Sequence, residues 1–217
     1  MKPLLITTTL LDNYAWFVNS PASWKKRAYE GFVSTLTRAP FKPTPQIQRG
    51  ISFERKINNL IHGTKENFLA QLGKQCGLFY DICKGGEQQR KIKRVLRVGD
   101  FDYLLYGKVD YWFPDINIDA KTTSNYSSGR KKYLDKTQHL MYSFIEEKPD
   151  FTYIVAVFND PEEGPLAEKP DYVDVIDISV NLLEAERIIS ERITDCISFI
   201  RNDPDMKKAY LEKFNWN

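Results

Sequence analysis

Two aspartates and a lysine stand in a stretch of sequence that otherwise favours β-structure. Asp110 belongs to the run YLLYGKVDYWF, residues 103–113. Asp119 and Lys121 belong to the run INIDAKT, residues 116–122. The dipeptide between the runs, Pro-Asp, favours a turn that would bring them side by side. The two carboxylates would then repel each other, and a divalent cation such as Mg²⁺ or Mn²⁺, which prefers oxygen ligands, would remove that penalty.

Lys121 adds a second chemical function, because an amine beside a metal ion can orient or deprotonate a water, or stabilise charge on a phosphate. Other interpretations stay open. Asp119 and Lys121 share one face of a strand, so they can equally form a weak ion pair on a solvent-exposed side of the sheet. Asp102, in the sequence GDFD, competes with Asp110 as the first carboxylate. We favour Asp110, because GD at 99–100 is a turn at the far end of the hairpin from Asp119.

The periodicity of the apolar residues predicts the elements that position these side chains. Helical spacing predicts helices over about 10–18, 23–38, 49–62, 65–75, 133–147 and 180–201, with a short one after 204. In the helix over 133–147, His139 is expected on the exposed side, facing away from Gln138. Alternating or continuous apolar runs predict strands over 91–98, 103–113, 116–122, 151–158 and 172–178.

The order of these elements predicts an α/β fold. The run FTYIVAVF, residues 151–158, is almost continuously apolar, as expected of a strand buried on both faces. Because it follows a predicted helix, we expect one parallel crossover within a mixed central sheet flanked by helices. The length of 217 residues fits one domain. We expect a helical N-terminal annex over 1–48 and an α/β catalytic core over 49–217.

Composition limits the classes of protein. Hydrophobic residues make up 42% of the chain and the net charge is +2, so a core can form and any nucleic-acid contact must come from a local basic patch. Cys76, Cys83 and Cys196 are scattered, which predicts free thiols in a reducing cytosol rather than disulfides or a zinc site. No apolar run reaches the roughly 18 residues of a spanning helix, and the N-terminus is too polar for a signal peptide. We therefore expect a cytoplasmic protein without a membrane segment.

Four short motifs, in order, resemble those of the PD-(D/E)XK nuclease superfamily, within it the RecB-type and lambda-exonuclease-like branch that includes phage-type nucleases. They are GISFE at 50–54, GKVD at 107–110, DAKT at 119–122 and QHLMY at 138–142. The first resembles the helix motif in which a glycine precedes a metal ligand. The next two resemble the strands that carry the acids and the lysine, and the last resembles the glutamine-x-x-x-tyrosine helix. The resemblance implies a restriction-endonuclease-like fold.

This resemblance implies roles for individual residues. Glu54, Asp110 and Asp119, with the backbone carbonyl of Ala120, would bind one or two Mg²⁺ or Mn²⁺ ions. Lys121 would serve the attacking water. From the residues alone, Glu54 can also be a glutamate at the rim of an apolar helix stripe. Some members of the superfamily hold an iron–sulfur cluster with four cysteines, and three scattered cysteines predict that this chain has none.

Substrate contacts are predicted in two places. The resemblance puts Gln138 and Tyr142 close to a DNA end or the site, although a boundary glutamine and a core tyrosine are the plainer alternatives. The loop after the catalytic strand carries Arg130, Lys131 and Lys132, which could hold phosphates or form an ordinary solvated surface.

We therefore expect a metal-dependent deoxyribonuclease and, within that class, an exonuclease of phage-type recombination or repair in a bacterial or phage-infected cell. The chain has no G-x-x-x-x-G-K-[ST] loop, so a helicase motor is not expected. The alternatives are a non-catalytic DNA-binding or assembly module with the nuclease fold, and a restriction-type endonuclease. DNA is the implied partner, a recombinase or single-strand-binding protein is a candidate protein partner, and an oligomer is compatible with the family.

Overall fold

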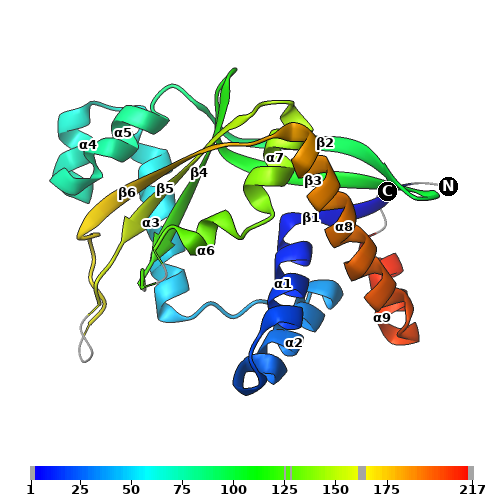
Figure 1. Cartoon of the computed structure of the whole chain (residues 1–217). Coiled ribbons are helices and arrows are strands. Elements are labelled where there is room, and N and C mark those ends of the chain that lie inside the picture. The colour runs from blue at the N-terminus through cyan, green and yellow to red at the C-terminus, as the bar shows by residue number, and fades with distance from the viewer. Residues whose placement is uncertain (1–2, 125, 128, 161–164, 215–217) are drawn as a thin grey trace.

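A six-stranded mixed sheet runs through the middle of the molecule in the computed structural model, which describes residues 3–214 except 125, 128 and 161–164 (Figure 1). The strand order is β1-β3-β4-β5-β6, and β2 pairs with β3. The strands are β1 (Leu4–Thr7), β2 (Glu87–Val98), β3 (Phe101–Trp112), β4 (Ile116–Thr123), β5 (Asp150–Val157) and β6 (Tyr172–Ser179). The predicted α/β class is thereby confirmed.

The pairing of the strands follows the predicted turns. β2 and β3 form an antiparallel hairpin through the turn at 99–100, where Gly99 has a φ of 59°. β3 and β4 are also antiparallel, but their ladder is short, from Tyr111 with Ile118 to Trp112 with Asn117. β4 and β5 are parallel along their whole length, which confirms the predicted crossover. β3 and β4 therefore diverge beyond their short ladder, and this divergence opens the sheet beside Asp110.

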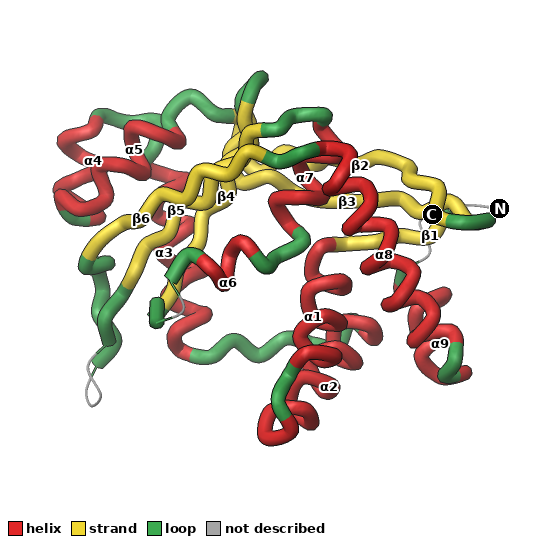
Figure 2. The backbone as a smooth tube through the Cα atoms, viewed as in Figure 1, coloured by secondary structure: helices red, strands yellow, loops and turns green. Residues whose placement is uncertain are grey.

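Helices cover both faces of the sheet (Figure 2). They are α1 (Thr8–Asn19), α2 (Ala22–Thr37), α3 (Pro45–Leu60), α4 (Lys65–Leu72), α5 (Gly77–Cys83), α6 (Lys131–Leu134), α7 (Gln138–Glu146), α8 (Leu182–Arg201) and α9 (Pro204–Lys213). No helix in the described ranges is long and apolar enough to cross a membrane. Side-chain caps start several of them; the Thr7 hydroxyl, for example, accepts a hydrogen bond from the Leu10 N–H at 3.3 Å.

Two apolar clusters lie on opposite sides of β5. Phe151, Tyr153 and Val155 belong to a cluster with residues of α1, α2, α7, α8 and α9. Ile154 and Ala156 belong to a second cluster with residues of α3, α4 and α5. The strand is thus buried on both faces, as its continuous apolar run predicts.

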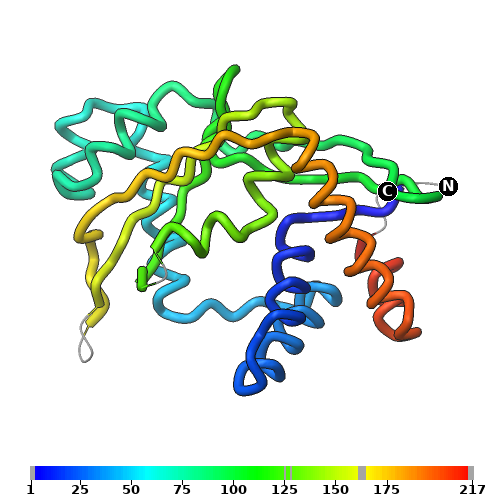
Figure 3. Tube along the Cα trace, viewed as in Figure 1, coloured from blue at the N-terminus to red at the C-terminus, as the bar shows by residue number. Residues whose placement is uncertain are grey.

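The N-terminal segment is not purely helical. Its described part begins with β1, a strand that the sequence patterns do not predict, paired parallel to β3. Leu5 and Phe32 from this segment are buried in the larger cluster, and α3 spans the expected boundary between residues 48 and 49. The Leu5 N–H also donates to the Phe214 carbonyl at 3.0 Å, so the two ends of the described chain lie side by side (Figure 3).

The predicted helix over 133–147 is two helices, because the chain turns between α6 and α7. Groups distant in sequence hold this turn. Asp12 accepts a hydrogen bond from the Thr137 N–H at 2.8 Å, and Arg192 donates to the Thr137 hydroxyl at 2.5 Å. The helix α5 is likewise absent from the predicted elements. The break decides which side chains of α7 face the sheet.

Candidate active site

Asp110 lies where β3 and β4 diverge. Its Oδ2 accepts a hydrogen bond from the backbone N–H of Ala120 at 2.9 Å. The carboxylate therefore occupies a position that a backbone carbonyl would take in a continuous ladder. Asp102, the alternative first carboxylate, lies at the far end of the hairpin beside Arg97, with 3.6 Å between the charged atoms. The geometry thus brings Asp110, and not Asp102, next to the strand that carries Asp119.

Asp119 is almost completely buried, with 1% of its surface exposed. Its Oδ2 forms an ion pair with the Lys121 ammonium, and its Oδ1 accepts a hydrogen bond from the Gln138 amide of α7. The alternative of a solvent-exposed face for this side of β4 is therefore wrong, since Asn117 is buried there as well. The physical reason is that α7 and its neighbours cover this face, so the two charges had to be paired inside.

Glu54 reaches the same region from α3. Close approach of this helix to β4 depends on Gly50, because a Cβ atom there would overlap the Thr122 hydroxyl. The side-chain amide of Gln89 donates to Glu54 Oε1 at 3.2 Å and to Asp110 Oδ1 at 3.0 Å. One nitrogen therefore joins the carboxylates of a helix and a strand that are distant in sequence.

Gln89 is not among the predicted site residues. The signal that identifies it is the register of the hairpin: a turn at 99–100 places residue 89 opposite residue 110, and the observed ladder has this register. A polar residue opposite a candidate metal ligand is therefore itself a candidate site residue.

The electrostatics of the site follow from burial and from crowding of carboxylates. Burial raises the pKa of Asp110 well above its ordinary value, and the nearby Asp119 and Glu54 raise it further, against the opposing effect of Lys121. Burial alone would lower the pKa of Lys121, but Asp119 and Asp110 outweigh it and raise this pKa. Lys121 is therefore held as an ammonium, while burial and the neighbouring carboxylates disfavour the negative charge of Asp110.

The donor chemistry of these residues fits a hard divalent cation. The charged neighbours of Asp110 are two further carboxylates, those of Asp119 and Glu54, and one ammonium, that of Lys121, so negative charge is in excess. In the described residues, however, no group of three or more His, Cys, Asp or Glu side chains is close enough to hold one ion. The expected convergence of all three acids on one point is therefore not present in these side-chain positions. The reason is that Asp119 is turned toward Lys121 and Gln138, whereas the other two share Gln89.

Solvent-accessible space adjoins the site. A cavity of about 240 Å³ is lined by Glu54, Ala120 and Lys121, among others. A second cavity, of about 330 Å³, shares Thr122 with the first and extends to Lys132. Lys121 is thus accessible from the side of α3.

The predicted substrate residues of α7 are both engaged with the protein. Gln138 donates to Asp119. Tyr142 is buried, and its hydroxyl accepts from the Lys108 N–H at 3.3 Å and donates to the Lys108 carbonyl at 3.2 Å. Its ring lies so close to β3 that a Cβ at Gly107 would overlap it, which explains the glycine of the GKVD motif. Both side chains therefore fix the strands that carry the acids.

The basic residues at 130–132 differ in their partners: two form ion pairs with aspartates, and one bonds a hydroxyl near the site. Arg130 pairs with Asp174 of β6 at 2.8 Å, and Lys131 pairs with an aspartate one turn later at 2.9 Å. Lys132 donates to the Thr123 hydroxyl at 2.8 Å and lines the cavity beside the site. Of the three predicted phosphate contacts, Lys132 is the one that lines the cavity adjoining the candidate site.

His139 is buried, with 4% of its surface exposed, so the prediction of an exposed histidine is wrong. Its Nδ1 lies 3.4 Å from the Tyr153 hydroxyl. Burial lowers the pKa of His139 to about 4, and Arg192 contributes in the same direction. The imidazole is therefore neutral at neutral pH. Because α7 starts at Gln138, residue 139 faces the sheet rather than solvent.

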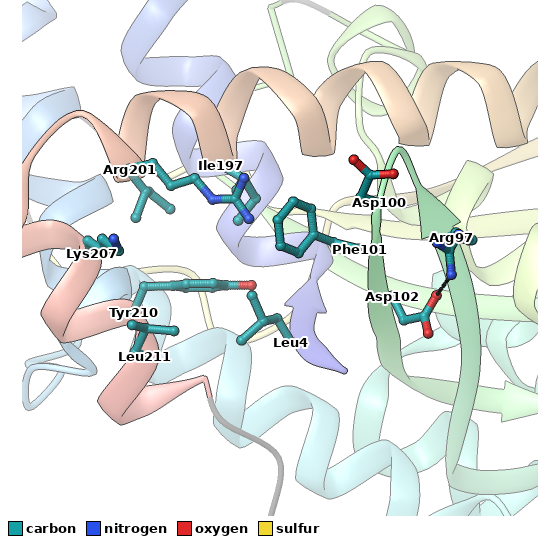
Figure 4. A pocket seen from close by; sticks show the side chains of 11 residues that line it. Leu4, Arg97, Asp100, Phe101, Asp102, Ile197, Arg201, Lys207, Tyr210 and Leu211 are labelled. Atoms are coloured by element: carbon teal, nitrogen blue, oxygen red, sulfur yellow. Dashed lines mark ion pairs between the residues drawn. The ribbon is translucent and has the colours of Figure 1, made fainter. Parts of the chain in front are cut away.

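A larger cavity, of about 910 Å³, lies away from the acids, between the β2–β3 turn and helices α8 and α9 (Figure 4). Several residues that line this cavity contact one another. Arg97 contacts Asp102 at 3.6 Å, and the Arg201 guanidinium lies 4.1 Å from the centre of the Phe101 ring. Size alone therefore does not mark the candidate site, which is identified by its chemistry.

Comparison with known proteins places the fold. No protein-family model and no curated protein sequence matches the chain. The crystal structure of SSO0001 is similar over 92% of this chain and 78% of its own, with 14% identity and a TM-score of 0.54. A phage-related exonuclease from Haemophilus somnus 129PT aligns over 97% of this chain and 95% of its own, with 9% identity and a TM-score of 0.48.

The alkaline exonuclease LHK-Exo from Laribacter hongkongensis aligns over 95% of this chain and 90% of its own, with 9% identity and a TM-score of 0.46. Its complex with dAMP has a TM-score of 0.44. Exonucleases are thus among the structural neighbours of this chain. At these identities the likeness to SSO0001 concerns the fold, and the likenesses with TM-scores below 0.5 carry no argument about the reaction.

Proposed function

We propose that the chain is a metal-dependent deoxyribonuclease that hydrolyses DNA phosphodiester bonds, with one nuclease domain over residues 1–217. The observation that carries the proposal is the juxtaposition of Asp110, Asp119 and Lys121 at the divergence of β3 and β4, with Glu54 joined to Asp110 through one amide. Burying this much negative charge is costly, and a site for a cation explains why the fold retains it.

In the proposed mechanism, Glu54, Asp110, Asp119 and the Ala120 carbonyl would hold Mg²⁺ or Mn²⁺, which would supply Lewis acidity and activate a water. The residues of the chain position the other participants. Lys121, held as an ammonium by Asp119, donates hydrogen bonds to the water or to a phosphate oxygen. Gln138 fixes the orientation of Asp119, and Lys132 binds a flanking phosphate.

The test uses two conservative substitutions and a matched control. Glu54→Gln and Asp110→Asn remove charge with little change in shape, and each should abolish cleavage of linear DNA in Mg²⁺ or Mn²⁺. Asp102→Asn changes an acid on the same strand that pairs with Arg97 at the far end of the hairpin, so it should cleave like the unaltered protein. Equal cleavage by Asp110→Asn would refute the assignment.

Linear and circular DNA substrates distinguish exonuclease from endonuclease activity. We infer an exonuclease that acts in the cytoplasm of a bacterial or phage-infected cell during recombination or repair, with a recombinase or single-strand-binding protein as partner. A linear duplex should be degraded from its ends while a covalently closed circle stays intact. Cleavage of the circle would instead identify a restriction-type endonuclease.

A non-catalytic DNA-binding module is the second candidate. One observation favours it: Lys121 and Gln138 engage Asp119 so that no three acids in the described residues stand close enough to hold one ion. This candidate predicts DNA binding, measured by fluorescence anisotropy, without cleavage in any divalent cation. The same cleavage assay therefore separates the two candidates.

A further inference from the structure

Gln89 has a backbone conformation that strands rarely contain. Its φ is 57°, in the left-handed region, although it lies inside β2. In the described residues, the other non-glycine positions with positive φ are Arg38 and Glu147, and both of these close helices as left-handed caps. Gln89 thus has no helix end to account for its conformation. Such a conformation is unfavourable for a residue with a side chain, so something must offset it.

The strand pairing is interrupted at this residue. Gln88 pairs with Tyr111 and Arg90 pairs with Val109, whereas Gln89 and Asp110, which face each other in the same register, are not paired as backbone. The side chain of Gln89 bonds to the neighbouring acids instead. Its Nε2 donates to Glu54 Oε1 at 3.2 Å and to Asp110 Oδ1 at 3.0 Å. The strained residue therefore directs its amide at two carboxylates that we assign to the cation.

We propose that Gln89 is a positioning residue for the divalent cation, one that holds Glu54 of α3 and Asp110 of β3 with their oxygens toward a common point. This inference rests on the proposed function. The chemistry of the amide suits the task, because two N–H groups satisfy two carboxylates without adding charge. A lysine at this position would neutralise the acids and compete with the cation, and an acid would add to their repulsion.

The two carboxylate oxygens of Asp110 accept hydrogen bonds from different donors. Oδ2 is fixed by the Ala120 N–H, so Oδ1 is the oxygen left for Gln89 and for a cation. Glu54 lacks such a backbone anchor among the contacts described, and its link to the site is the Gln89 amide. Loss of that amide should therefore release Glu54 from Asp110 and weaken cation binding more than it weakens the fold.

Calorimetric titration of the full chain with Mn²⁺ tests the inference. Gln89→Gly removes the amide and relieves the left-handed backbone, so it should fold as well as the unaltered protein but bind Mn²⁺ at least tenfold more weakly. Gln88→Ala is the matched control, because the Gln88 amide donates to the Asn58 carbonyl at 3.3 Å rather than to the acids. That variant should bind Mn²⁺ within about twofold of the unaltered protein. Thermal melting in EDTA checks that each variant is folded.

The possible results separate the two proposals. Unchanged or tighter Mn²⁺ binding by Gln89→Gly, with normal binding by the unaltered protein, overturns the role of Gln89 and leaves the proposed function standing. Absence of Mn²⁺ binding by the unaltered protein overturns both. If Gln89→Gly is unfolded in EDTA, Gln89→Asn, which keeps a shorter amide, takes its place, and unchanged Mn²⁺ affinity of that variant overturns the role.

Discussion

At the scale of single residues, the site is a set of buried charges that stabilise one another incompletely. Asp119 has both a cation and an amide as partners, whereas Asp110 has the Ala120 N–H and the Gln89 amide but no ammonium of its own. Asp110 is therefore the residue at which the proposed function and the stability of the fold conflict most directly. Two predictions belong to this scale.

Asp110→Asn should raise the free energy of unfolding at pH 8 in EDTA. The pKa of Asp110 is raised in the folded state by burial and by Asp119, so the folded protein holds that proton more tightly than the unfolded chain. Stability is then lost as the pH rises above the ordinary aspartate range, and an uncharged amide escapes this loss. Urea denaturation measures the difference. A less stable Asp110→Asn protein would contradict this account of the charge.

His139 gives the opposite dependence on pH. Its folded-state pKa of about 4 lies below the unfolded value near 6.5, so the unfolded chain binds more protons between these pH values. Acidification through this window should cost up to about 3 kcal/mol of stability. His139→Gln should remove that part of the slope, as measured by denaturation at pH 7 and pH 4.5. Parallel pH profiles of the two proteins would show that His139 is not the group responsible.

Residue spacing and the order of the motifs were sufficient to select Asp110, Asp119, Lys121 and Glu54 as candidates, because both are local properties of the sequence, and their role at a metal site stays a prediction. They were not sufficient for Gln89, whose importance comes from its register and its left-handed backbone. Nor could they determine that the Tyr142 hydroxyl bonds the backbone of β3, since that contact joins residues 34 positions apart.

At the scale of elements, the hairpin of β2 and β3 carries two lysines directly opposite each other. Lys91 pairs with Lys108 in the register, and both are exposed. Like charges in such positions destabilise a sheet. Lys91→Glu should therefore raise the free energy of unfolding by about 0.2–1 kcal/mol at low salt. The increase should shrink in 1 M salt, and an equal increase at both salt concentrations would exclude an electrostatic origin.

The packing of α7 on β3 depends on Gly107. Gly107→Ala should destabilise the protein by about 1–3 kcal/mol, because the new methyl group overlaps the Tyr142 ring. In a Tyr142→Leu background the same substitution should cost much less, which a double-mutant cycle by chemical denaturation would measure. Gly77→Ala is a suitable control, since the nearest atom to its new Cβ is 3.9 Å away. Additive effects at 107 and 142 would show that the ring is not the obstacle.

Long helices and strands with a clear period were predictable, but the elements fixed by distant contacts were not. β1 has four residues, too few to display a period, and it exists because β3 offers it an edge. The turn between α6 and α7 is held by Asp12 and Arg192, which lie more than 50 residues from Thr137. No local signal in the sequence contains that information.

At the scale of the whole molecule, the chain closes on itself at the edge of β1. The backbone of Leu5 forms two hydrogen bonds at this edge. Its N–H donates to the Phe214 carbonyl, and its carbonyl accepts from the Tyr210 hydroxyl at 3.0 Å. Tyr210→Phe should cost about 1 kcal/mol of stability, because a buried carbonyl loses its partner. Thermal denaturation measures the loss. An unchanged melting temperature would mean that the Tyr210 hydroxyl contributes nothing to the stability of the fold.

The divergence of β3 and β4 has a consequence for how the sheet and the chemistry depend on each other. One oxygen of Asp110 links the two strands through the Ala120 N–H, and the other accepts from the Gln89 amide. The link between the strands and the proposed cation contact therefore use different oxygens of a single carboxylate. Under the proposed function, a cation can bind to one oxygen and dissociate from it without breaking the hydrogen bond that links the strands. This requires a side chain at residue 110 with the length of an aspartate.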